Sequence, residues 1–374
     1  MKRIAVASDS FKGTLSSSEI CEIAKRVIPE YFPECEVFAM PVADGGEGTV
    51  DCFLKLGAVP VTAEVCGPFF EKVRAVYARL GDTAIIEMSA AAGLPLAGDK
   101  KDPERTTTYG VGELIKHAVN SGCRRILLGL GGSATNDGGC GMAAALGAVF
   151  RGSDGNEFIP TGGTLFGIRA VFLREIDKFL DGVDIIAMCD VNNPLCGKNG
   201  ASYVYGPQKG ADQEAAARLD KGLERLSSIM TVIRGEDISD LPGAGAAGGM
   251  GAGCMWFLKG ILMPGTEAIL DAAGFSRALR SADYVITGEG RLDSQSLSGK
   301  LISGVKARAD AAGVPVIAIA GCIKKGEEDL FKDFRKIYTT SDRYAPIEEL
   351  RKYAKMNYEN ALRRFCVDAL GGRL

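Results

Sequence analysis

Histidine is nearly missing from this sequence: His117 is the only one in 374 residues. This argues against a Ser/His/Asp triad, a Cys/His dyad and a zinc site built from histidines, because each of these needs at least one histidine in the reacting or ligating set. His117 itself lies in "GELIKHAVNSG", opposite the apolar stripe of a predicted helix, so we expect it to be exposed. Any acid or base chemistry must therefore come from carboxylates, lysine or tyrosine.

Other features are also missing. There is no long basic run and the formal net charge is −3, so nucleic acid is not expected as a partner. The beginning, "MKRIAVASDS", reads as a strand and not as a signal peptide. The uncharged run 241–258 is rich in Gly and Ala, which is poor for a membrane helix of roughly 20 residues. The 11 cysteines include no CxxC pair and are expected as reduced, mostly buried thiols. We therefore expect a cytoplasmic enzyme.

The order of predicted elements indicates an α/β protein of two domains. "RIAVAS" and "EVFAMPV" read as strands, each followed by a helix, and the first helix has a capping box formed by Ser16 and Glu19. From about Pro60, three strands joined by short turns read as an antiparallel meander. Strand and helix alternation returns near both "RRILLGL" and "DYVITGEG". We infer a discontinuous Rossmann-like parallel-sheet domain, 1–62 with 281–374, and an inserted mixed α/β domain, 63–280, with the active site in the cleft between them.

The loop "GLGGSATNDGGCG", 129–141, is the most informative stretch. It lies between a predicted strand and a predicted helix, and its glycines would let the backbone contact a ligand. Amide groups and a helix N-terminus favour an anion, so the loop predicts a phosphate site. The expected nucleotide contacts are Gly131, Gly132, Ser133, Thr135, Asn136 and Asp137. The loop also fits a GxGxxA dinucleotide pattern, but no second strand ending in an acid follows, and the strict P-loop pattern is absent.

Several other loops place acids beside glycines after apolar strands. The loops "SDSFKG", "ADGGEG", "MCDVNNPLCGKNGA" and "TGEGRLDSQSLSGK" should meet at the carboxyl ends of parallel strands. Their charged and polar residues are Asp9, Ser10, Lys12, Asp44, Glu47, Asp190, Asn193, Glu289, Arg291 and Asp293. Carboxylates that converge repel one another unless a cation is bound, and Mg²⁺ with a polyphosphate suits such a site. Phosphoryl transfer needs no histidine, so this composition fits it best.

Taken together, six motifs resemble the bacterial glycerate kinase family, in the same order along nearly the whole chain. They are "ASDSFKGTLSS", "PVADGGEGT", "GLGGSATNDGGCGMAAALG", "CDVNNPLCGKNGA", "GAGAAGGMGAG" and "TGEGRLDSQSLSGK". The resemblance implies ATP-dependent phosphorylation of D-glycerate with Mg²⁺, giving 2-phosphoglycerate, in a two-domain α/β protein. It implies small-molecule partners, D-glycerate and ATP. The sequence leaves the oligomeric state open, a homo-oligomer included.

The resemblance places the family's motifs on these residues, and the roles of individual residues are our own hypotheses. The 129–141 loop would hold the triphosphate, and Asp190 and Asp293 would supply the base and the metal ligand, in an order left open. Glu289 would join them at the metal. Lys12 and Arg291 would hold the glycerate carboxylate or the transferring phosphate. The remaining substrate contacts would be Asp9, Ser10, Asp44, Glu47 and Asn193.

Three alternatives remain open at this stage. The same fold could give 3-phosphoglycerate. The GxGxxA match would fit a nicotinamide-dependent oxidoreductase of a small hydroxy acid. A nucleotide sensor without catalysis would bind ATP and not turn it over. The segment "GAGAAGGMGAG" would either let two backbones approach closely or act as a hinge for domain closure.

Overall fold

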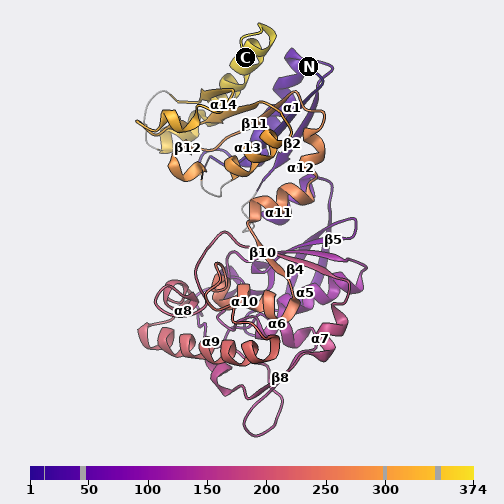
Figure 1. The fold of residues 1–374 in the computed structure, drawn as a ribbon, viewed down its shortest axis with the longest axis vertical. Helices are drawn as coiled ribbons and strands as arrows, with labels where there is room; N and C mark the ends of the chain where they lie inside the picture. Colours follow the sequence, from indigo (N-terminus) through magenta and orange to yellow (C-terminus); the bar gives the residue numbers. More distant parts are fainter. Residues whose placement is uncertain (12, 43–47, 298–300, 342–346) are drawn as a thin grey trace. The chain divides into compact units, whose positions relative to one another are not determined.

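A computed structural model describes residues 1–11, 13–42, 48–297, 301–341 and 347–374. They form two compact units: unit 1 is Met1–Asp44 with Thr266–Leu374, and unit 2 is Gly45–Gly265. Figure 1 shows both ends of the chain, indigo at the N-terminus and orange to yellow at the C-terminus, building unit 1 together. The fold is α/β, as predicted.

The unit boundaries differ from 62/63 and 280/281, the positions expected from sequence. Strand β3 (Val59–Cys66) pairs along its whole length with β4 (Lys72–Leu80), which keeps the segment before residue 62 in unit 2. At the other boundary, Arg308 of α13 (Leu301–Ala311) forms ion pairs with Glu267 and Asp271 of α11 (Gly265–Ala272). These contacts tie α11 to unit 1 ahead of residue 281.

Unit 1 contains a five-stranded sheet in which every neighbouring pair is parallel. The strands, in spatial order, are β15 (Lys336–Thr339), β13 (Val316–Ala320), β11 (Tyr284–Thr287), β1 (Arg3–Ser8) and β2 (Glu36–Pro41). The three central strands, β13, β11 and β1, are almost continuously buried, which is typical of a parallel sheet covered on both faces. Strand β1 joins the two ends of the chain, because it pairs with β2 on one side and with β11 on the other.

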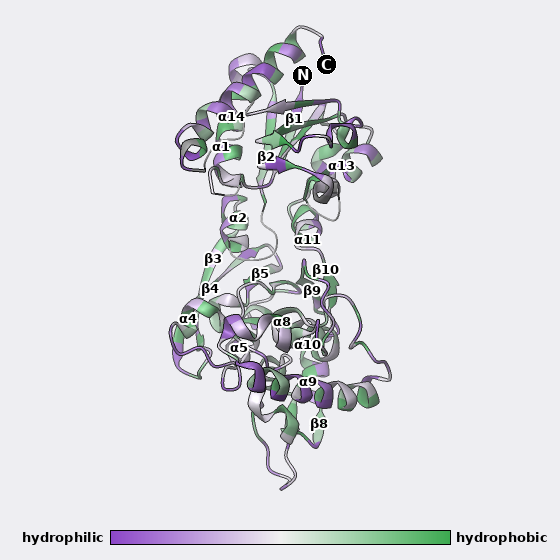
Figure 2. Ribbon diagram, turned by 90° about the vertical axis from the view of Figure 1, so that its left-hand side faces the viewer, coloured by the Kyte–Doolittle hydropathy of each residue, from purple (hydrophilic) through white to green (hydrophobic). Residues whose placement is uncertain are grey.

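Helices cover both faces of this sheet. Helices α1 (Ser17–Tyr31) and α14 (Ile347–Leu370) lie side by side on one face, and α13 lies on the other (Figure 2). The predicted capping box is present: the Ser16 hydroxyl accepts from the Glu19 amide at 3.2 Å, and the Glu19 carboxylate accepts from the Ser16 amide at 2.9 Å. Unit 1 also contains the short α12 (Phe275–Leu279).

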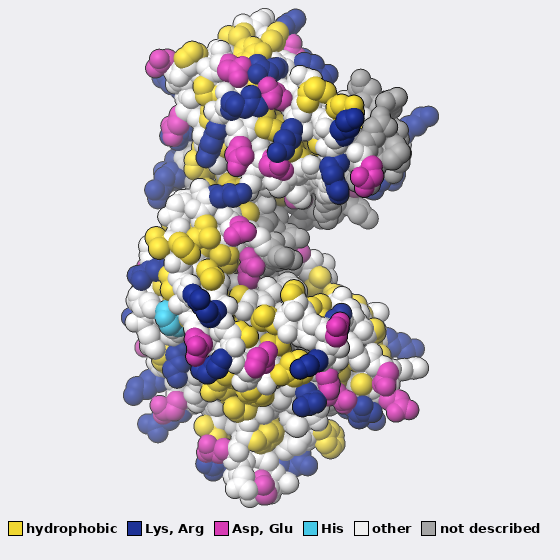
Figure 3. All heavy atoms as spheres, turned by 180° about the vertical axis from the view of Figure 1, so that it is seen from behind, with side chains coloured by type: hydrophobic (Ala, Val, Ile, Leu, Met, Phe, Trp, Pro, Cys, Tyr) yellow, Lys and Arg dark blue, Asp and Glu magenta, His cyan; other side chains and the backbone are white. Residues whose placement is uncertain are grey.

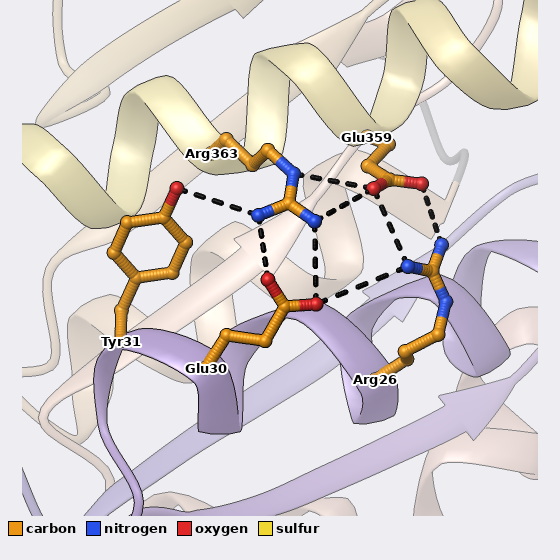
Figure 4. A network of polar contacts seen from close by, with 5 residues as sticks. All are labelled: Arg26, Glu30, Tyr31, Glu359 and Arg363. Carbon is orange, nitrogen blue, oxygen red and sulfur yellow. Dashed lines mark hydrogen bonds and ion pairs between the residues drawn. The ribbon is translucent and has the colours of Figure 1, made fainter.

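An ion-pair network joins α1 to α14 (Figure 4). Arg26 of α1 and Arg363 of α14 both contact Glu359, at 2.5 and 2.8 Å, and Arg363 also contacts Glu30 at 2.6 Å. These arginines lower the pKa of Glu359 to about 2 from its ordinary value of 4.5. The network connects two helices that lie more than 300 residues apart in the sequence.

Unit 2 contains a mixed six-stranded sheet. In spatial order its strands are β10 (Ile261–Met263), β9 (Asp184–Met188), β6 (Arg125–Gly129), β5 (Thr83–Glu87), β4 and β3. Strands β3, β4 and β5 form the antiparallel meander expected from sequence, and β5, β6, β9 and β10 are parallel. The carboxyl ends of the four parallel strands therefore meet at one edge.

The helices of unit 2 pack around this sheet. They are α2 (Thr49–Lys55), α3 (Ser89–Ala92), α4 (Leu94–Ala97), α5 (Tyr109–Asn120), α6 (Cys140–Ala145), α7 (Arg174–Phe179), α8 (Ala201–Tyr205), α9 (Gln213–Arg234) and α10 (Ala246–Leu258). On α5 the predicted apolar stripe is buried, while the single histidine, His117, lies at the surface (cyan, Figure 3). Strands β7 (Val149–Arg151) and β8 (Ala170–Phe172) form a separate two-stranded sheet.

Most of the uncharged run at 241–258 belongs to the core of unit 2. Most of α10 is buried there, including Trp256 and Phe257. Within the described ranges, no helix is both long enough and apolar enough to span a membrane. All 11 cysteines are free thiols, and most of them are buried, as expected from their scattered positions.

Candidate active site

In unit 1, two loops from opposite ends of the sequence meet at the carboxyl edge of the parallel sheet. The Asp9 amide donates to the Gly288 carbonyl at 2.9 Å, and the Ser8 hydroxyl donates to the same carbonyl at 3.0 Å. The Asp9 carboxylate accepts from the Ser10 amide at 2.6 Å. Because the strand order reverses at β1 and β11, this edge is the switch point at which open α/β sheets place ligands.

The loop after β11 adds two carboxylates and one guanidinium group to this edge. Glu289 and Asp293 are buried, at 9% and 6% exposure. The Asp293 carboxylate accepts from Nε and Nη2 of Arg291, at 3.2 and 3.0 Å. The Arg291 side chain nevertheless remains 56% exposed, so its guanidinium can contact a further anion.

In unit 2, the glycine-rich loop turns its polar side chains inward. Gly132 is exposed and Gly131 is half-buried, while every residue from Ser133 to Cys140 is buried. The Ser133 hydroxyl contacts the Thr135 hydroxyl at 3.1 Å, and the Asn136 side-chain amide donates to the Ser202 hydroxyl at 3.1 Å. These side chains contact the protein itself, so the loop presents its backbone at Gly131 and Gly132.

Asp137 explains how the loop holds its shape. Its carboxylate accepts hydrogen bonds from the amide and the hydroxyl of Thr108, both at 2.8 Å, and from the amides of Gly139 and Gly141, at 3.1 and 3.2 Å. Burial raises the pKa of Asp137, and these four hydrogen bonds oppose that rise. The sequence predicts a bound phosphate at the start of α6. In the structure, the Asp137 carboxylate accepts hydrogen bonds from the amides there.

Distant segments hold the backbone of the same loop. The Leu94 amide donates to the Gly132 carbonyl and the Thr106 hydroxyl donates to the Ala134 carbonyl, both at 2.9 Å. The Gly138 amide donates to the Gly248 carbonyl of α10 at 3.1 Å. The loop is therefore fixed along its length by three other parts of unit 2.

The glycines of "GAGAAGGMGAG" permit this close approach. Ala247, Gly248 and Gly249 are all left-handed, with φ of 54°, 74° and 85°. A Cβ on Gly248 would lie 2.0 Å from the Thr135 carbonyl oxygen, which only glycine avoids. Of the two sequence interpretations of this segment, close backbone approach is the one that these contacts match.

The loop after β9 leaves the sheet at the same edge as the glycine-rich loop, because β9 and β6 are parallel neighbours. Asp190 is exposed, and its carboxylate accepts from the Gly265 amide at 2.9 Å. Asn193 ties the loop together: its side-chain oxygen accepts from the Tyr205 hydroxyl at 2.6 Å, and its amide donates to the Asn199 carbonyl at 2.8 Å.

The predicted site residues are thus divided between the units. Glu289 and Asp293 belong to unit 1 and Asp190 to unit 2. Within the part of the chain that the structure describes, no group of three or more His, Cys, Asp or Glu side chains is arranged to hold a metal ion. Three predicted residues lie outside the described residues: Lys12, Asp44 and Glu47.

Sequence reasoning missed several residues that shape the loop. They are Thr106, Thr108, Ser202 and Lys209, all of which are buried. Lys209 lies in "GPQKGA", a short polar stretch between turn-forming residues that gives no signal of burial. The threonines precede α5 in "TTTYG" and contact the loop only because the chain folds back on itself.

The geometry argues against a nicotinamide site at the glycine-rich loop. A dinucleotide fold needs a second parallel strand beside the first, reached through the helix that follows the loop. Here α6 leads to β7, which pairs antiparallel with β8 in a separate sheet, and β9, the parallel neighbour of β6, follows only after β8 and α7.

Comparison with known proteins gives the family. A family model described as the Glycerate kinase family matches residues 4–369. The chain belongs to the glycerate kinase family. The resemblance seen in the six motifs and the expectation of a kinase are thereby confirmed.

Members of this family resemble the chain closely. It is 43% identical over 362 residues to the glycerate kinase of Bacillus cereus, covering 96% of this chain and 95% of that protein. It is 44% identical over 328 residues to the glycerate 2-kinase of Escherichia coli K12, covering 86% and 85%. A crystal structure assigned as glycerate kinase 2 of Salmonella typhimurium LT2 matches with a TM-score of 0.86 at 39% identity, over 100% of this chain and 99% of that one. This match supports the α/β fold predicted from sequence.

Proposed function

We propose that this protein transfers the γ-phosphoryl group of ATP to D-glycerate and releases 2-phosphoglycerate. The observation that carries the proposal is the similarity to the Escherichia coli glycerate 2-kinase, 44% identical over 86% of this chain. The near absence of histidine is consistent with it, because phosphoryl transfer depends on positioning and charge neutralisation.

The triphosphate is proposed to bind along the backbone of the glycine-rich loop, at Gly131 and Gly132. These residues form the accessible part of the loop, whereas Ser133, Thr135 and Asn136 turn inward. The proposal changes the role of these three side chains from nucleotide contacts to supports of the loop. Asp137 has the same supporting role, because its carboxylate already accepts four hydrogen bonds from the protein.

The transfer itself needs a base and positive charge. In the proposed reaction, the glycerate hydroxyl oxygen bonds to the γ-phosphorus as the bond to the β-phosphate oxygen breaks. The hydroxyl proton passes to Asp190 or Asp293. Arg291, which remains largely exposed beside Asp293, would hold the glycerate carboxylate or the moving phosphoryl group, together with Lys12. Further substrate contacts are proposed for Asp9, Ser10, Asp44, Glu47 and Asn193.

The donor set fits Mg²⁺. This ion prefers oxygen ligands and is usually held by one or two carboxylates plus substrate phosphates, so a cage of three acids is unnecessary. Glu289 and Asp293 are buried carboxylates in one loop, and Asp190 is an exposed carboxylate at a strand end. These residues would hold the ion, whose charge would balance that of the phosphates.

We also propose that the protein works in the cytoplasm, where ATP is available and where 11 free thiols stay reduced. Its partners would be small molecules, with no nucleic acid involved. A homo-oligomer remains compatible with this function.

The test is coupled ADP release by the wild-type protein with MgATP, with and without D-glycerate, followed by identification of the phosphoglycerate isomer by ³¹P NMR. We expect ADP release that depends on D-glycerate, with 2-phosphoglycerate as the product. Formation of 3-phosphoglycerate would overturn the proposed regiochemistry. Tight ATP binding without turnover would indicate a nucleotide sensor, and stabilisation by NAD(H) but not by MgATP would indicate an oxidoreductase.

A further inference from the structure

Lys209 is a buried lysine beneath the glycine-rich loop. It ends a short 3₁₀ helix, Pro207–Lys209, and is only 2% exposed. Its ammonium donates to the Thr135 carbonyl at 2.6 Å and to the Ser133 hydroxyl at 3.3 Å. Among the lysines and arginines that the structure describes, it is the one that is buried.

Such a lysine is costly to keep. Removing an ammonium group from water is strongly unfavourable, and an apolar side chain of similar volume is often equally or more stabilising. Burial lowers the pKa of Lys209 to about 7, from an ordinary value of 10.5, while the Asp137 carboxylate opposes that shift. Titratable groups perturbed in this way concentrate at functional sites.

The position of Lys209 indicates what its burial achieves. The contacts to Gly132, Ala134 and Gly138 come from neutral groups of other segments. Lys209 differs from these groups because its ammonium is a cation. It donates hydrogen bonds to Thr135 and Ser133, which follow the accessible glycines. A charged donor forms stronger hydrogen bonds than a neutral one. It also places positive charge beneath a backbone proposed to bind a triphosphate.

We propose that Lys209 is a positioning residue for the nucleotide, fixing Ser133 and Thr135 so that the Gly131–Gly132 backbone keeps the shape that binds the triphosphate. This inference rests on the proposed function. It assigns Lys209 to nucleotide binding and not to glycerate binding or proton transfer, because its ammonium is enclosed by the loop. The protonated form makes the contacts, so nucleotide binding should weaken as pH rises through the pKa of Lys209. The charged group of the loop that acts on it is Asp137.

The test compares Lys209→Met with Lys221→Met, the same substitution at an exposed lysine of α9. Affinity for the non-hydrolysable analogue AMP-PNP with Mg²⁺ is measured by calorimetry from pH 6 to 9, and the kinetics of phosphorylation are measured alongside. We expect Lys209→Met to raise the Kd for AMP-PNP and the KM for ATP by about tenfold or more. The KM for glycerate and kcat should change by less than about threefold, and Lys221→Met should match the wild type.

The pH series separates positioning from a general structural role. Wild-type affinity for AMP-PNP should fall between pH 6 and 9, and the fall should be absent in Lys209→Met. Unchanged AMP-PNP affinity in Lys209→Met would overturn the inference. A fall in kcat with equal rises in both KM values and a lower melting temperature would also overturn it. If the methionine variant does not fold, Lys209→Gln carries the test: weaker AMP-PNP binding at wild-type melting temperature supports the inference, and unchanged binding refutes it.

The calorimetry also keeps this inference distinct from the proposed function. If the wild type binds AMP-PNP but does not phosphorylate glycerate, the proposed function fails. The dependence of AMP-PNP binding on Lys209 is still measured in that case, and it decides the inference by itself.

Discussion

The two units use the carboxyl edge of parallel strands in different ways. In unit 1 the edge carries charged side chains, and Arg291 stays largely exposed beside the buried Asp293. In unit 2 the glycine-rich loop buries its polar side chains, and the Asp137 carboxylate accepts four hydrogen bonds from the protein. The unit 1 edge offers side-chain chemistry, whereas the glycine-rich loop at the unit 2 edge offers a rigid backbone beside the exposed Asp190.

This difference changes how a loop such as "GLGGSATNDGGCG" should be interpreted. Polar residues between glycines suggest ligand contacts, yet here Ser133 and Asn136 form hydrogen bonds within the protein. A preorganised backbone costs little to arrange when the ligand arrives, which is what charge stabilisation requires. If the comparison is correct, substitutions in the unit 2 loop should damage stability and nucleotide binding. Substitutions at the unit 1 edge, and at Asp190 beside the unit 2 loop, should damage turnover.

The largest expected effect is that of Gly248→Ala. The added Cβ would lie 2.0 Å from the Thr135 carbonyl oxygen, at a residue with φ of +74°. We expect a loss of more than about 4 kcal/mol in the free energy of unfolding, measured by urea denaturation, or no soluble protein. Gly235→Ala is the control, since its φ is +81° with no atom within 4 Å, and should cost about 1 kcal/mol. Equal effects of the two variants would contradict close packing at the loop.

Asp137→Ala should be the next most damaging change. It would leave buried donors of Thr108, Gly139 and Gly141 without their acceptor, at a cost of about 3 kcal/mol in unfolding free energy. Asp181→Ala removes an exposed carboxylate of the same unit and should be nearly neutral. Urea denaturation of both variants measures the difference. A stable Asp137→Ala protein that had lost only nucleotide affinity would restore Asp137 as a ligand contact.

Asp190→Asn and Asp293→Asn should act on turnover. Each is expected to lower kcat by at least ~10²-fold, equivalent to about 2.7 kcal/mol in the activation barrier, with the melting temperature close to that of the wild type. Steady-state kinetics with D-glycerate and MgATP measure this, with Asp181→Asn as the matched control. Turnover near wild type in either variant would remove that residue from the proposed reaction.

The smallest effect is expected in the α1–α14 network of unit 1. The pKa of Glu359 is about 2 when folded, against an ordinary 4.5, so its contribution to stability is present above pH 4.5 and is lost as pH falls toward 2. The pair is partly exposed, so Glu359→Gln should cost less than about 1 kcal/mol at pH 7. Melting temperatures of the wild type and the variant should approach each other below pH 4.5 and converge near pH 2. Glu34→Gln, at an exposed position, should show no such convergence.

Local patterns in the sequence were sufficient for much of the fold. Strand β1 follows "RIAVAS" residue for residue, the capping box at Ser16 starts α1, and β3, β4 and β5 form the expected meander. Each of these depends on neighbours within a few residues or on the apolar period of one element. The strand-end positions of Asp9 and Glu289 in unit 1 and of Asp190 in unit 2 also followed, because each comes shortly after a predicted apolar strand.

The rest depends on contacts between segments far apart in the sequence. Nothing in the sequence near Lys209 indicates that its ammonium will lie 2.6 Å from the Thr135 carbonyl oxygen. Nothing near Gly248 indicates that the same oxygen will leave no room for a side chain there. The inward turn of Ser133 and Asn136 has the same origin. The unit boundaries lie earlier in the chain than expected from sequence, because they depend on strand pairing by β3 and on ion pairs to α11.

The central claim is that the triphosphate binds the backbone of the glycine-rich loop in a glycerate kinase. A crystal structure of the protein with Mg²⁺, AMP-PNP and D-glycerate tests this most directly. The account predicts phosphate oxygens within hydrogen-bond distance of the Gly131 or Gly132 amides, with the side chains of Thr135 and Asn136 still turned inward. Phosphates bound away from residues 129–141 would contradict it.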